Sequence, residues 1–258
     1  MHNKYCKTIL GLKKTACNIA AKTELGRLPL DYFIKTQIIL YFCRLNTENI
    51  NPLLKEAYHI NKTLHNDGVY SWYTSTWKIF EECGLQTTDY ENLNSPFCKI
   101  KSKIKKNFKK VISEKYTEYM QSKLRNTTDN SKLFFYSKLK SHIQMEEYLL
   151  FENSFKNRQT LTKFRVSDHT LKIEQGRYLN IPREQRLCSE CQTVDDEKHF
   201  FLDCKINKHL RDILFNHINT IYDNFKDYSS EEKLHFILKY NNDILSKICD
   251  FTKQSLEL

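Results

Sequence analysis

The sequence predicts an all-α fold, a helical array with one small module of irregular chain inserted between its helices. The 258 residues include only five Gly and four Pro, which leaves little material for the tight turns of an all-β fold. Apolar residues recur instead at the spacing that places them on one face of a helix, over most of the chain. The chain is long enough for one large domain or two modest ones with a hydrophobic core.

Residues 1–84 are expected to form a helical segment. Short helices are predicted over 5–12 and 15–25, the second of them ended by Gly26. Asp31 is the expected N-cap of a longer helix that reaches residue 45. The side chains predicted to face the core from that helix are Ile34, Ile38, Tyr41 and Phe42.

Two further helices are predicted in this segment. Pro52 is suited to the first position of a helix, and Ser71 is a suitable N-cap for another that ends near residue 84. On the latter, Tyr73, Trp77 and Phe80 fall on one face. Aromatic side chains in such a row can stack on bases. The absence of an accompanying Arg or Lys cluster favours the simpler interpretation, a row of core side chains.

Residues 85–126 are expected to comprise a polar linker, 86–95, and a long basic amphipathic helix, 96–126. One side of this helix carries the densest positive charge in the chain, formed by Lys99, Lys101, Lys103, Lys105, Lys106, Lys109 and Lys110. Such a run can be a solvated face alone. Acidic residues hardly relieve it before Glu114, so mutual repulsion favours contact with a phosphate backbone.

Residues 127–258 are expected to form a helical domain that contains the irregular module, 188–204. Helices are predicted over 131–151, 155–165, 208–224, 231–239 and 243–256. A second nucleic-acid-binding surface is predicted from residues before the module, namely Arg158, Lys163, Arg165, Arg177, Arg183 and Arg186. For Arg177 and Arg186 the alternative is that they hold the loop, by binding carbonyl oxygens or Glu174 and Glu184.

Cys188, Cys191, His199 and Cys204 have the spacing of a tetrahedral zinc site. A Cys-x-x-Cys turn lets two sulfurs converge on one Zn²⁺ ion at about 2.3 Å, and a nearby His and Cys complete the tetrahedron. Because protein ligands fill all four positions, the site is expected to be structural, with no open position for an activated water.

Other interpretations of the cysteines are a redox pair, a disulfide, or buried thiols that happen to cluster. A thioredoxin-like motif needs a strand-helix-strand pattern, and a disulfide framework is typical of short secreted chains. The acidic run at 195–197 is expected to be a solvated loop over the metal, with Phe200, Phe201 and Leu202 packed beneath it. Asp203 and His209 are close enough in sequence to substitute as ligands.

The charge balance indicates a polyanionic partner. Lys and Arg number 41 against 31 Asp and Glu, a net charge of +10. Nine scattered Cys favour a reducing compartment, hence an intracellular location, nuclear or cytoplasmic. No membrane partner is expected, because the most apolar run, 38–43, is far shorter than the roughly 20 residues that span a bilayer.

The segment 158–204 resembles the C-terminal zinc-knuckle (CCHC) region of non-LTR, LINE-type retrotransposon polyproteins, downstream of the reverse transcriptase. The similar stretches are Phe-Arg-Val-Ser-Asp-His at 164–169, Leu-x-Ile-Glu-x-Gly-Arg-Tyr at 171–178, Ile-Pro-Arg-Glu-x-Arg-Leu-Cys at 181–188 and Asp-Glu-x-His-Phe-Phe-Leu-x-Cys at 196–204. Residues 10–15, 24–30, 54–58 and 71–72 more loosely resemble the helical segment after the polymerase thumb. The Tyr/Phe-x-Asp-Asp motif of a polymerase palm does not occur in this sequence.

The resemblance implies a zinc-stabilised tail that binds RNA or single-stranded DNA and is not catalytic by itself. One alternative is an interaction module that docks on a reverse transcriptase domain, and another is a retroelement remnant without function. An enzyme is not expected, because the metal site is full and the sequence has no nuclease cluster, nucleophile elbow or phosphate-cradling Gly loop.

Overall fold

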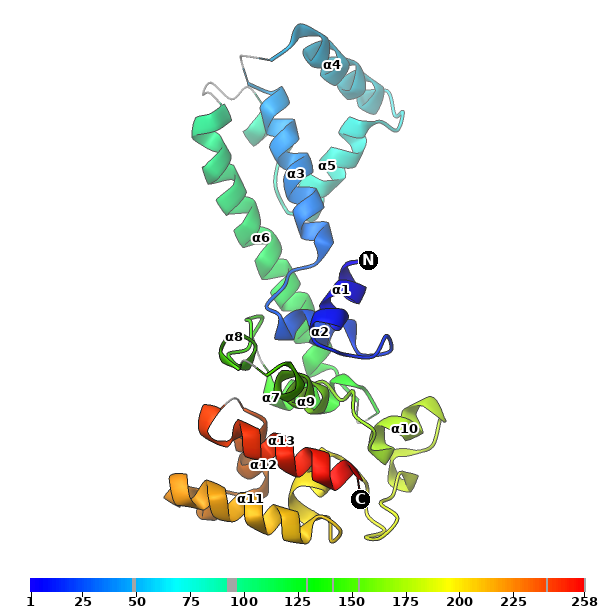
Figure 1. Cartoon of the computed structure of the whole chain (residues 1–258). Coiled ribbons are helices and arrows are strands. Elements are labelled where there is room, and N and C mark those ends of the chain that lie inside the picture. Colours follow the sequence, from blue (N-terminus) through cyan, green and yellow to red (C-terminus); the bar gives the residue numbers. More distant parts are fainter. Residues whose placement is uncertain are drawn as a thin grey trace. The chain divides into compact units, whose positions relative to one another are not determined.

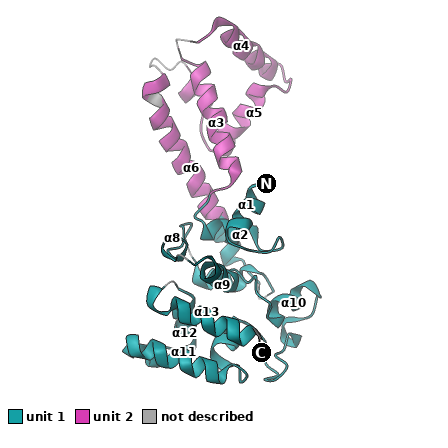
Figure 2. Cartoon of the chain, in the orientation of Figure 1, with its two compact units in different colours: residues 1–27, 120–258 teal, residues 28–119 magenta. Residues whose placement is uncertain are grey.

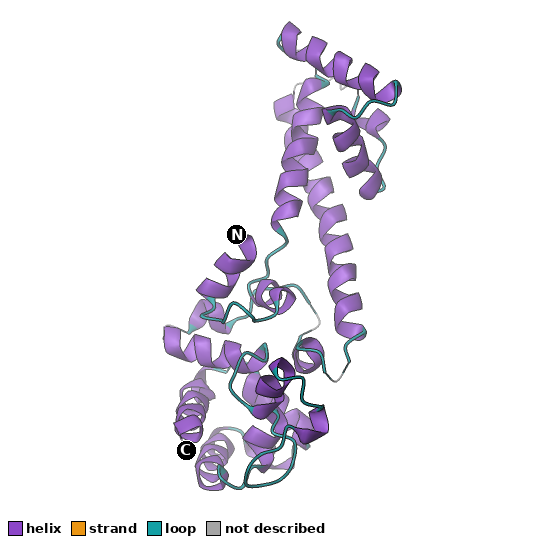
Figure 3. Cartoon of the chain, turned by 90° about the vertical axis from the view of Figure 1, so that its right-hand side faces the viewer, coloured by secondary structure: helices purple, strands orange, loops and turns teal. Residues whose placement is uncertain are grey.

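The structure, a computed structural model, describes residues 1–47, 50–91, 97–128, 130–140, 142–152, 154–239 and 241–257, and it is all-α as predicted (Figure 1). The described ranges contain no β-strand (Figure 3), and isolated bridges pair Leu25 with Met145 and Leu187 with Val194. In the same ranges no helix combines the length and the apolar character needed to cross a membrane.

The chain folds as two compact units (Figure 2). Unit 1 comprises residues 1–27 and 120–258, and unit 2 comprises residues 28–119. These bounds differ from the predicted segments 1–84, 85–126 and 127–258, because the N-terminal residues join the C-terminal part. The backbone N–H of Lys13 donates to Asp168 Oδ2 at 2.7 Å, and Gln159 Nε2 donates to the carbonyl of Gly11 at 2.7 Å.

Unit 2 is built around an aromatic cluster. Its elements are α3 (Leu30–Leu45), α4 (Pro52–Asn66), α5 (Trp72–Glu82), η1 (Thr87–Tyr90) and residues 97–119 of α6 (Phe97–Arg125). The rings of Tyr58, Tyr73 and Phe80 lie with their centroids 5.9, 6.0 and 5.0 Å from that of Phe42. Tyr73 and Phe80 are buried, and Trp77 is 37% exposed, so the aromatic row of α5 belongs mainly to the core.

Two predictions about α3 are wrong. Asp31 does not cap the helix, because Pro29 occupies the N-cap and Asp31 lies in the first turn, where it pairs with Lys35 at 2.9 Å. Of the predicted core face, Ile34 and Tyr41 are 50% and 42% exposed. Apolar residues occur on every side of this helix, so their spacing alone does not identify the buried side. The predicted cap of α5, Ser71, is confirmed and forms a capping box.

The predicted linker at 86–95 is part of unit 2 where it is described. Residues 87–90 form η1, and the carboxylate of Glu91 accepts hydrogen bonds from Tyr73 at 2.8 Å, Lys62 at 2.8 Å and Tyr58 at 3.2 Å. These donors come from α4 and α5. Glu91 therefore ties the segment to both helices, while residues 92–95 lie outside the described residues.

Unit 1 is the larger unit and contains the irregular module. Its elements are α1 (His2–Ile9), α2 (Asn18–Glu24), the end of α6, α7 (Leu133–Leu139), α8 (Tyr148–Phe151), α9 (Phe155–Arg165), α10 (Lys172–Tyr178), η2 (Arg183–Gln185), η3 (His199–Asp203), α11 (Lys208–Ile221), η4 (Asp223–Asp227), α12 (Ser230–Leu238) and α13 (Asn242–Glu257). α11 and α13 pack side by side (Figure 1). The main core cluster joins them to α9, α12 and the phenylalanines of η3.

The single helix predicted over 131–151 is wrong. α7 ends at Leu139 and α8 begins at Tyr148. Part of the chain between them pairs with the end of α2, where the backbone N–H of Glu146 donates to the carbonyl of Glu24 at 3.0 Å. The buried Lys140 donates to the carbonyl of Gln144 at 2.5 Å and pairs with Glu146. These tertiary contacts replace the continuation of the helix.

Candidate metal centre

Cys188, Cys191, His199 and Cys204 come together in unit 1, as their spacing predicts. One potential ligand atom from each residue lies within 4.8 Å of the other three. Cys188, His199 and Cys204 are buried, and Cys191 is half-buried. Sulfur ligands of a tetrahedral zinc ion are about 3.8 Å apart, given bonds of about 2.3 Å. The four side chains are therefore close enough to hold one metal ion.

A tight turn of the chain positions the first two cysteines. The backbone N–H of Cys188 donates to the carbonyl of Thr193 at 2.8 Å, and that of Gln192 donates to the carbonyl of Cys188 at 3.1 Å. Gln192 has a φ of 55°, in the left-handed region that residues with a Cβ seldom adopt. The hydrogen bonds therefore hold a sharp reversal, which brings Cys188 and Cys191 to the same point.

A wide helical turn positions the other two residues. In η3 the backbone N–H of Cys204 donates to the carbonyl of His199 at 2.8 Å, a π-type hydrogen bond across five residues. The turn begins where Asp196 Oδ1 accepts the backbone N–H of His199 at 3.0 Å. Single π turns are frequent at functional sites. This one brings the imidazole and the third thiol into the same cluster.

One ring nitrogen of His199 has a hydrogen-bond partner, and the other has none among the described residues. Nδ1 lies 3.1 Å from Thr193 Oγ1, whereas Nε2 is buried and finds no hydrogen-bond partner among the described residues. A buried polar atom without a partner is unfavourable. Nε2 is thus the atom available to an ion, with Nδ1–H donating to Thr193, the arrangement that orients a metal-binding histidine.

The main chain around the site also suits thiolates. The backbone N–H of Lys205 donates to Cys191 Sγ at 3.3 Å. Burial raises the pKa of the Cys204 thiol to about 11, although the N–H groups of Asn207 and Ile206 act in the opposite direction. A cation binds the deprotonated form, so binding of an ion here releases protons.

The aromatic residues after His199 form the floor of the module, as predicted. Phe200 and Phe201 are 4% and 0% exposed and belong to the main core cluster. Phe200 stacks on Phe164 of α9 with centroids 5.1 Å apart, and Phe201 stacks on Phe251 of α13 at 5.7 Å. The irregular module, 188–204, shares the core of unit 1 with α9 and α13. Unfolding of the module must therefore also disturb these two helices.

The acidic run after the turn is not a solvated loop, contrary to the prediction. Glu197 is 4% exposed. Its Oε1 accepts a hydrogen bond from Ser167 Oγ at 2.8 Å and lies 3.0 Å from His169 Nε2. Burial raises the pKa of Glu197, but the hydrogen bonds and charge of His169, with help from Ser167, outweigh it and hold the pKa below its usual value. The Ser-x-His pair at 167–169 was the available sequence signal for this cluster.

Two of the predicted nucleic-acid contacts are wrong, because the guanidinium groups are buried. Arg165 is 2% exposed, pairs with Glu24 at 3.1 Å and with Glu146 at 2.8 Å, and therefore has its charge neutralised inside the unit. Arg186 is also 2% exposed and donates to the carbonyl of Ile181 at 2.9 Å, which confirms the alternative interpretation, in which it holds the loop. The side chain of Arg186 passes so close to α10 that a Cβ added at Gly176 would lie 2.6 Å from it. This position therefore requires a glycine.

Arg177 and Arg183 hold the chain before the turn. Arg177 donates to the carbonyl of Ser131 at 3.0 Å and pairs with Glu174, so the alternative interpretation, in which it fixes the loop, is confirmed. Arg183 pairs with Asp196 at 2.8 Å and stays about a quarter exposed. Of the earlier residues, Arg158 donates to a main-chain oxygen and Lys163 is half-buried. The predicted second basic surface is thus largely used for structure.

Among the predicted nucleic-acid-binding residues, the lysines of α6 are the group that the structure leaves on the surface. All seven are exposed, namely Lys99, Lys101, Lys103, Lys105, Lys106, Lys109 and Lys110. Ile104 and Phe108 are 5% and 0% exposed in the core of unit 2, so the helix is amphipathic as predicted. The side chain of Ile100 lies outside the described residues. Asp203 and His209 are exposed and do not belong to the cysteine cluster.

The fold and the site define a class of protein, an all-α protein with a Cys₃His cluster able to hold a metal ion. No protein-family model, curated protein or solved structure matches this chain.

Proposed function

We propose that this chain is a zinc-stabilised module that binds RNA or single-stranded DNA, without catalysis of its own. The observation that carries the proposal is the Cys₃His cluster, in which one ring nitrogen of His199 lies near three sulfurs and its buried Nε2 has no hydrogen-bond partner among the described residues. Thiolate and imidazole ligands in a closed tetrahedral set favour Zn²⁺ over harder cations. Four protein ligands leave no position for an activated water, which is why the proposed role of the ion is structural.

The exposed lysines of α6 supply the proposed contact with nucleic acid. Within the described part of the chain none of the seven forms an ion pair that would neutralise it, and together they place positive charge over residues 99–110 of α6. Neutralising phosphates with such a surface releases counterions, so affinity falls steeply as salt rises. The resemblance of 158–204 to the zinc-knuckle region of LINE-type polyproteins supports a role beside a reverse transcriptase domain.

The test is the salt dependence of binding, measured by fluorescence anisotropy with a labelled U15 RNA and a T15 DNA. We expect the double variant K105E/K106E to weaken binding to both and to lower the salt slope by about one for each lost phosphate contact. The matched control is K247E/K253E, which makes the same charge change at exposed positions of α13. Affinity that does not depend on salt, or equal effects of the two double variants, would contradict the proposal.

A second candidate function, docking on a protein, is favoured by the outer side of α4. Leu53, Ile60 and Leu64 are 79%, 52% and 36% exposed and recur with Ala57 at helical spacing. Such a row is typical of a helix that fits an apolar groove. If the chain docks on a protein, we expect it to bind a reverse transcriptase domain even after nuclease treatment. We expect L53E/I60E to abolish this binding while RNA affinity stays unchanged.

A further inference from the structure

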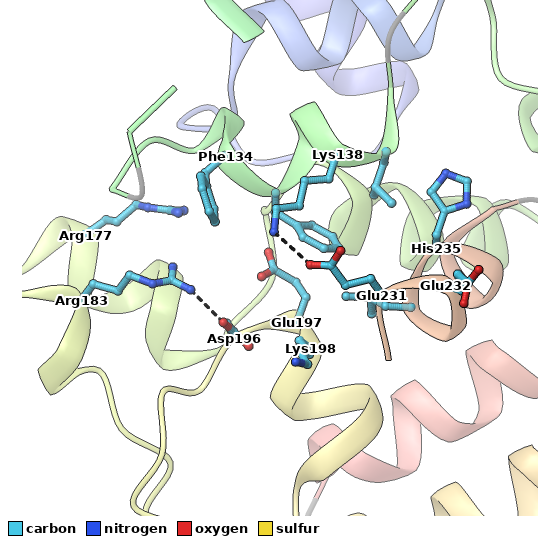
Figure 4. A pocket seen from close by; sticks show the side chains of 13 residues that line it. Phe134, Lys138, Arg177, Arg183, Asp196, Glu197, Lys198, Glu231, Glu232 and His235 are labelled. Carbon is cyan, nitrogen blue, oxygen red and sulfur yellow. Dashed lines mark hydrogen bonds and ion pairs between the residues drawn. The ribbon is translucent and has the colours of Figure 1, made fainter. Parts of the chain in front are cut away.

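A cavity of about 320 Å³ lies in unit 1 next to the metal module (Figure 4). Its lining comes from α7, from α12 and from the acidic run that precedes His199. Phe134, Leu139 and Leu234 provide apolar walls. The volume is at the lower end of the range for ligand pockets, about 300–1,000 Å³. It therefore suits one small ring system better than a chain.

One carboxylate marks the polar end of the cavity. Figure 4 shows the side chain of Glu197 pointing into the space, toward the side occupied by Phe134 and Lys138. Ser167 and His169 both direct their hydrogen-bonding atoms at Oε1. A carboxylate accepts about two hydrogen bonds at each oxygen. Neither of these side chains donates to Oε2, which can therefore accept from a ligand that carries N–H groups.

Cations flank the aromatic wall. Phe134 projects into the cavity from α7 (Figure 4), and Lys138 Nζ and the Arg183 guanidinium lie 5.0 and 5.5 Å from its ring centroid. Arg183 is fixed by Asp196 at 2.8 Å, whereas the pair of Lys138 with Glu231 is longer, 3.8 Å, and exposed. The Lys138 ammonium can therefore turn to an acceptor atom on a ligand. The cavity thus combines an acceptor, a flat apolar wall and a movable donor.

Guanine matches this arrangement better than the other bases. Its Watson–Crick edge presents two adjacent donors, N1–H and the N2 amino group, followed by the O6 acceptor. Adenine and cytosine place a ring acceptor next to their amino group, and uracil has one donor between two acceptors, so a carboxylate repels part of each edge. Unpaired bases of single-stranded RNA are commonly recognised by stacking and by hydrogen bonds to this edge.

We infer that this cavity binds one unstacked guanine of the single-stranded nucleic acid, with Glu197 accepting N1–H and N2–H, Lys138 donating to O6, and Phe134 packing against the ring. The inference rests on the proposed function and adds to it a base preference. The lysines of α6 contact phosphates and carry no sequence information. A pocket that fits one base supplies the sequence specificity that contacts between lysines and phosphates lack.

The test compares three RNA decamers by fluorescence anisotropy with the full chain, namely U10, U4GU5 and U4IU5. Inosine keeps N1–H and O6 but lacks the N2 amino group. We expect U4GU5 to bind about tenfold tighter than U10, and U4IU5 to lose most of that gain, because a hydrogen bond to a charged group is a strong one. F134A is expected to remove the gain while U10 binding stays unchanged, and F134Y is expected to keep it.

E197Q tests the acceptor itself. We expect it to abolish the preference for U4GU5, with circular dichroism and bound zinc used to show that the variant is folded. If the wild type binds the three decamers equally, the guanine site is wrong and the proposed function stands. If it binds none of them, the proposed function is wrong and the guanine site with it. Occupation of the cavity by an arginine peptide that guanosine monophosphate does not displace would also overturn the inference.

Discussion

His169 Nε2 lies 3.0 Å from Glu197 Oε1, with both side chains almost completely buried. His169 follows α9, and Glu197 directly precedes the π turn that carries His199 and Cys204. The pair therefore joins the metal module to the helical core through one polar contact. Phe164 stacks on the His169 ring at 5.0 Å and on Phe200 at 5.1 Å, which adds an apolar contact across the same junction.

H169A is expected to destabilise the protein strongly. It leaves the buried Glu197 carboxylate with one hydrogen-bond partner fewer, and a buried polar group left unsatisfied costs about 1–3 kcal/mol, more when the group is charged. Urea denaturation followed by circular dichroism measures the loss. The matched control is H209A at an exposed histidine, with an expected change within about 0.5 kcal/mol. Equal effects of the two variants would show that the junction is not a stabilising contact.

E197Q is expected to change the dependence of stability on pH. The pKa of Glu197 is lower in the folded chain than its ordinary value. Its carboxylate therefore stabilises the fold above the ordinary pKa of about 4.3, and this contribution is lost as pH falls through the lower folded value. The difference in unfolding free energy between wild type and E197Q should thus shrink as pH falls below the ordinary pKa of about 4.3. A difference that stays constant as pH falls below this value contradicts the assignment.

C188S is expected to lose the metal ion. The purified wild type should contain about one zinc per chain, and the variant much less, because a thiolate ligand is replaced by a hydroxyl. Structural zinc contributes roughly 10–16 kcal/mol of binding free energy near neutral pH. We therefore expect local unfolding after Asn180, seen as new protease cleavage there. C98S, at an exposed cysteine outside the cluster, should keep both zinc and protease resistance.

R165A is expected to destabilise the fold without changing the affinity of folded protein for RNA. Arg165 is buried, with its guanidinium shared between Glu24 and Glu146. Its removal leaves the buried Glu24 carboxylate without its counter-charge, whereas Glu146 keeps Lys140, and breaking a buried ion pair in this way costs about 3–5 kcal/mol. Anisotropy titrations corrected for the folded fraction separate this effect from binding. A lower RNA affinity of the folded variant would mean that Arg165 reaches the nucleic acid after all.

The sequence specified several local features of unit 1 and unit 2 directly. α9 has the predicted bounds, Ser71 caps α5, and the lysines of α6 occupy its exposed side. Each of these depends on residues within one or two helical turns of each other, so short-range spacing is sufficient to predict them. The same holds for Cys188 and Cys191, whose convergence requires only the turn between them.

Contacts between segments distant in the sequence determined which charged side chains are buried. Arg165 and Arg186 were predicted to lie on the surface, yet the fold brings them partners that are distant in the sequence, Glu24 and the side chain of Asn130. The acidic neighbours of Glu197 led to the prediction that its side chain is solvated. Its burial is possible only because Ser167 and His169 contact its carboxylate. The sequence by itself determined the all-α class, most of the helices, the clustering of Cys188, Cys191, His199 and Cys204, and the charge of the chain, since these follow from local spacing and composition. The tertiary structure alone decided which charges are neutralised inside and which remain outside, because a charge is buried only where distant segments supply its partners.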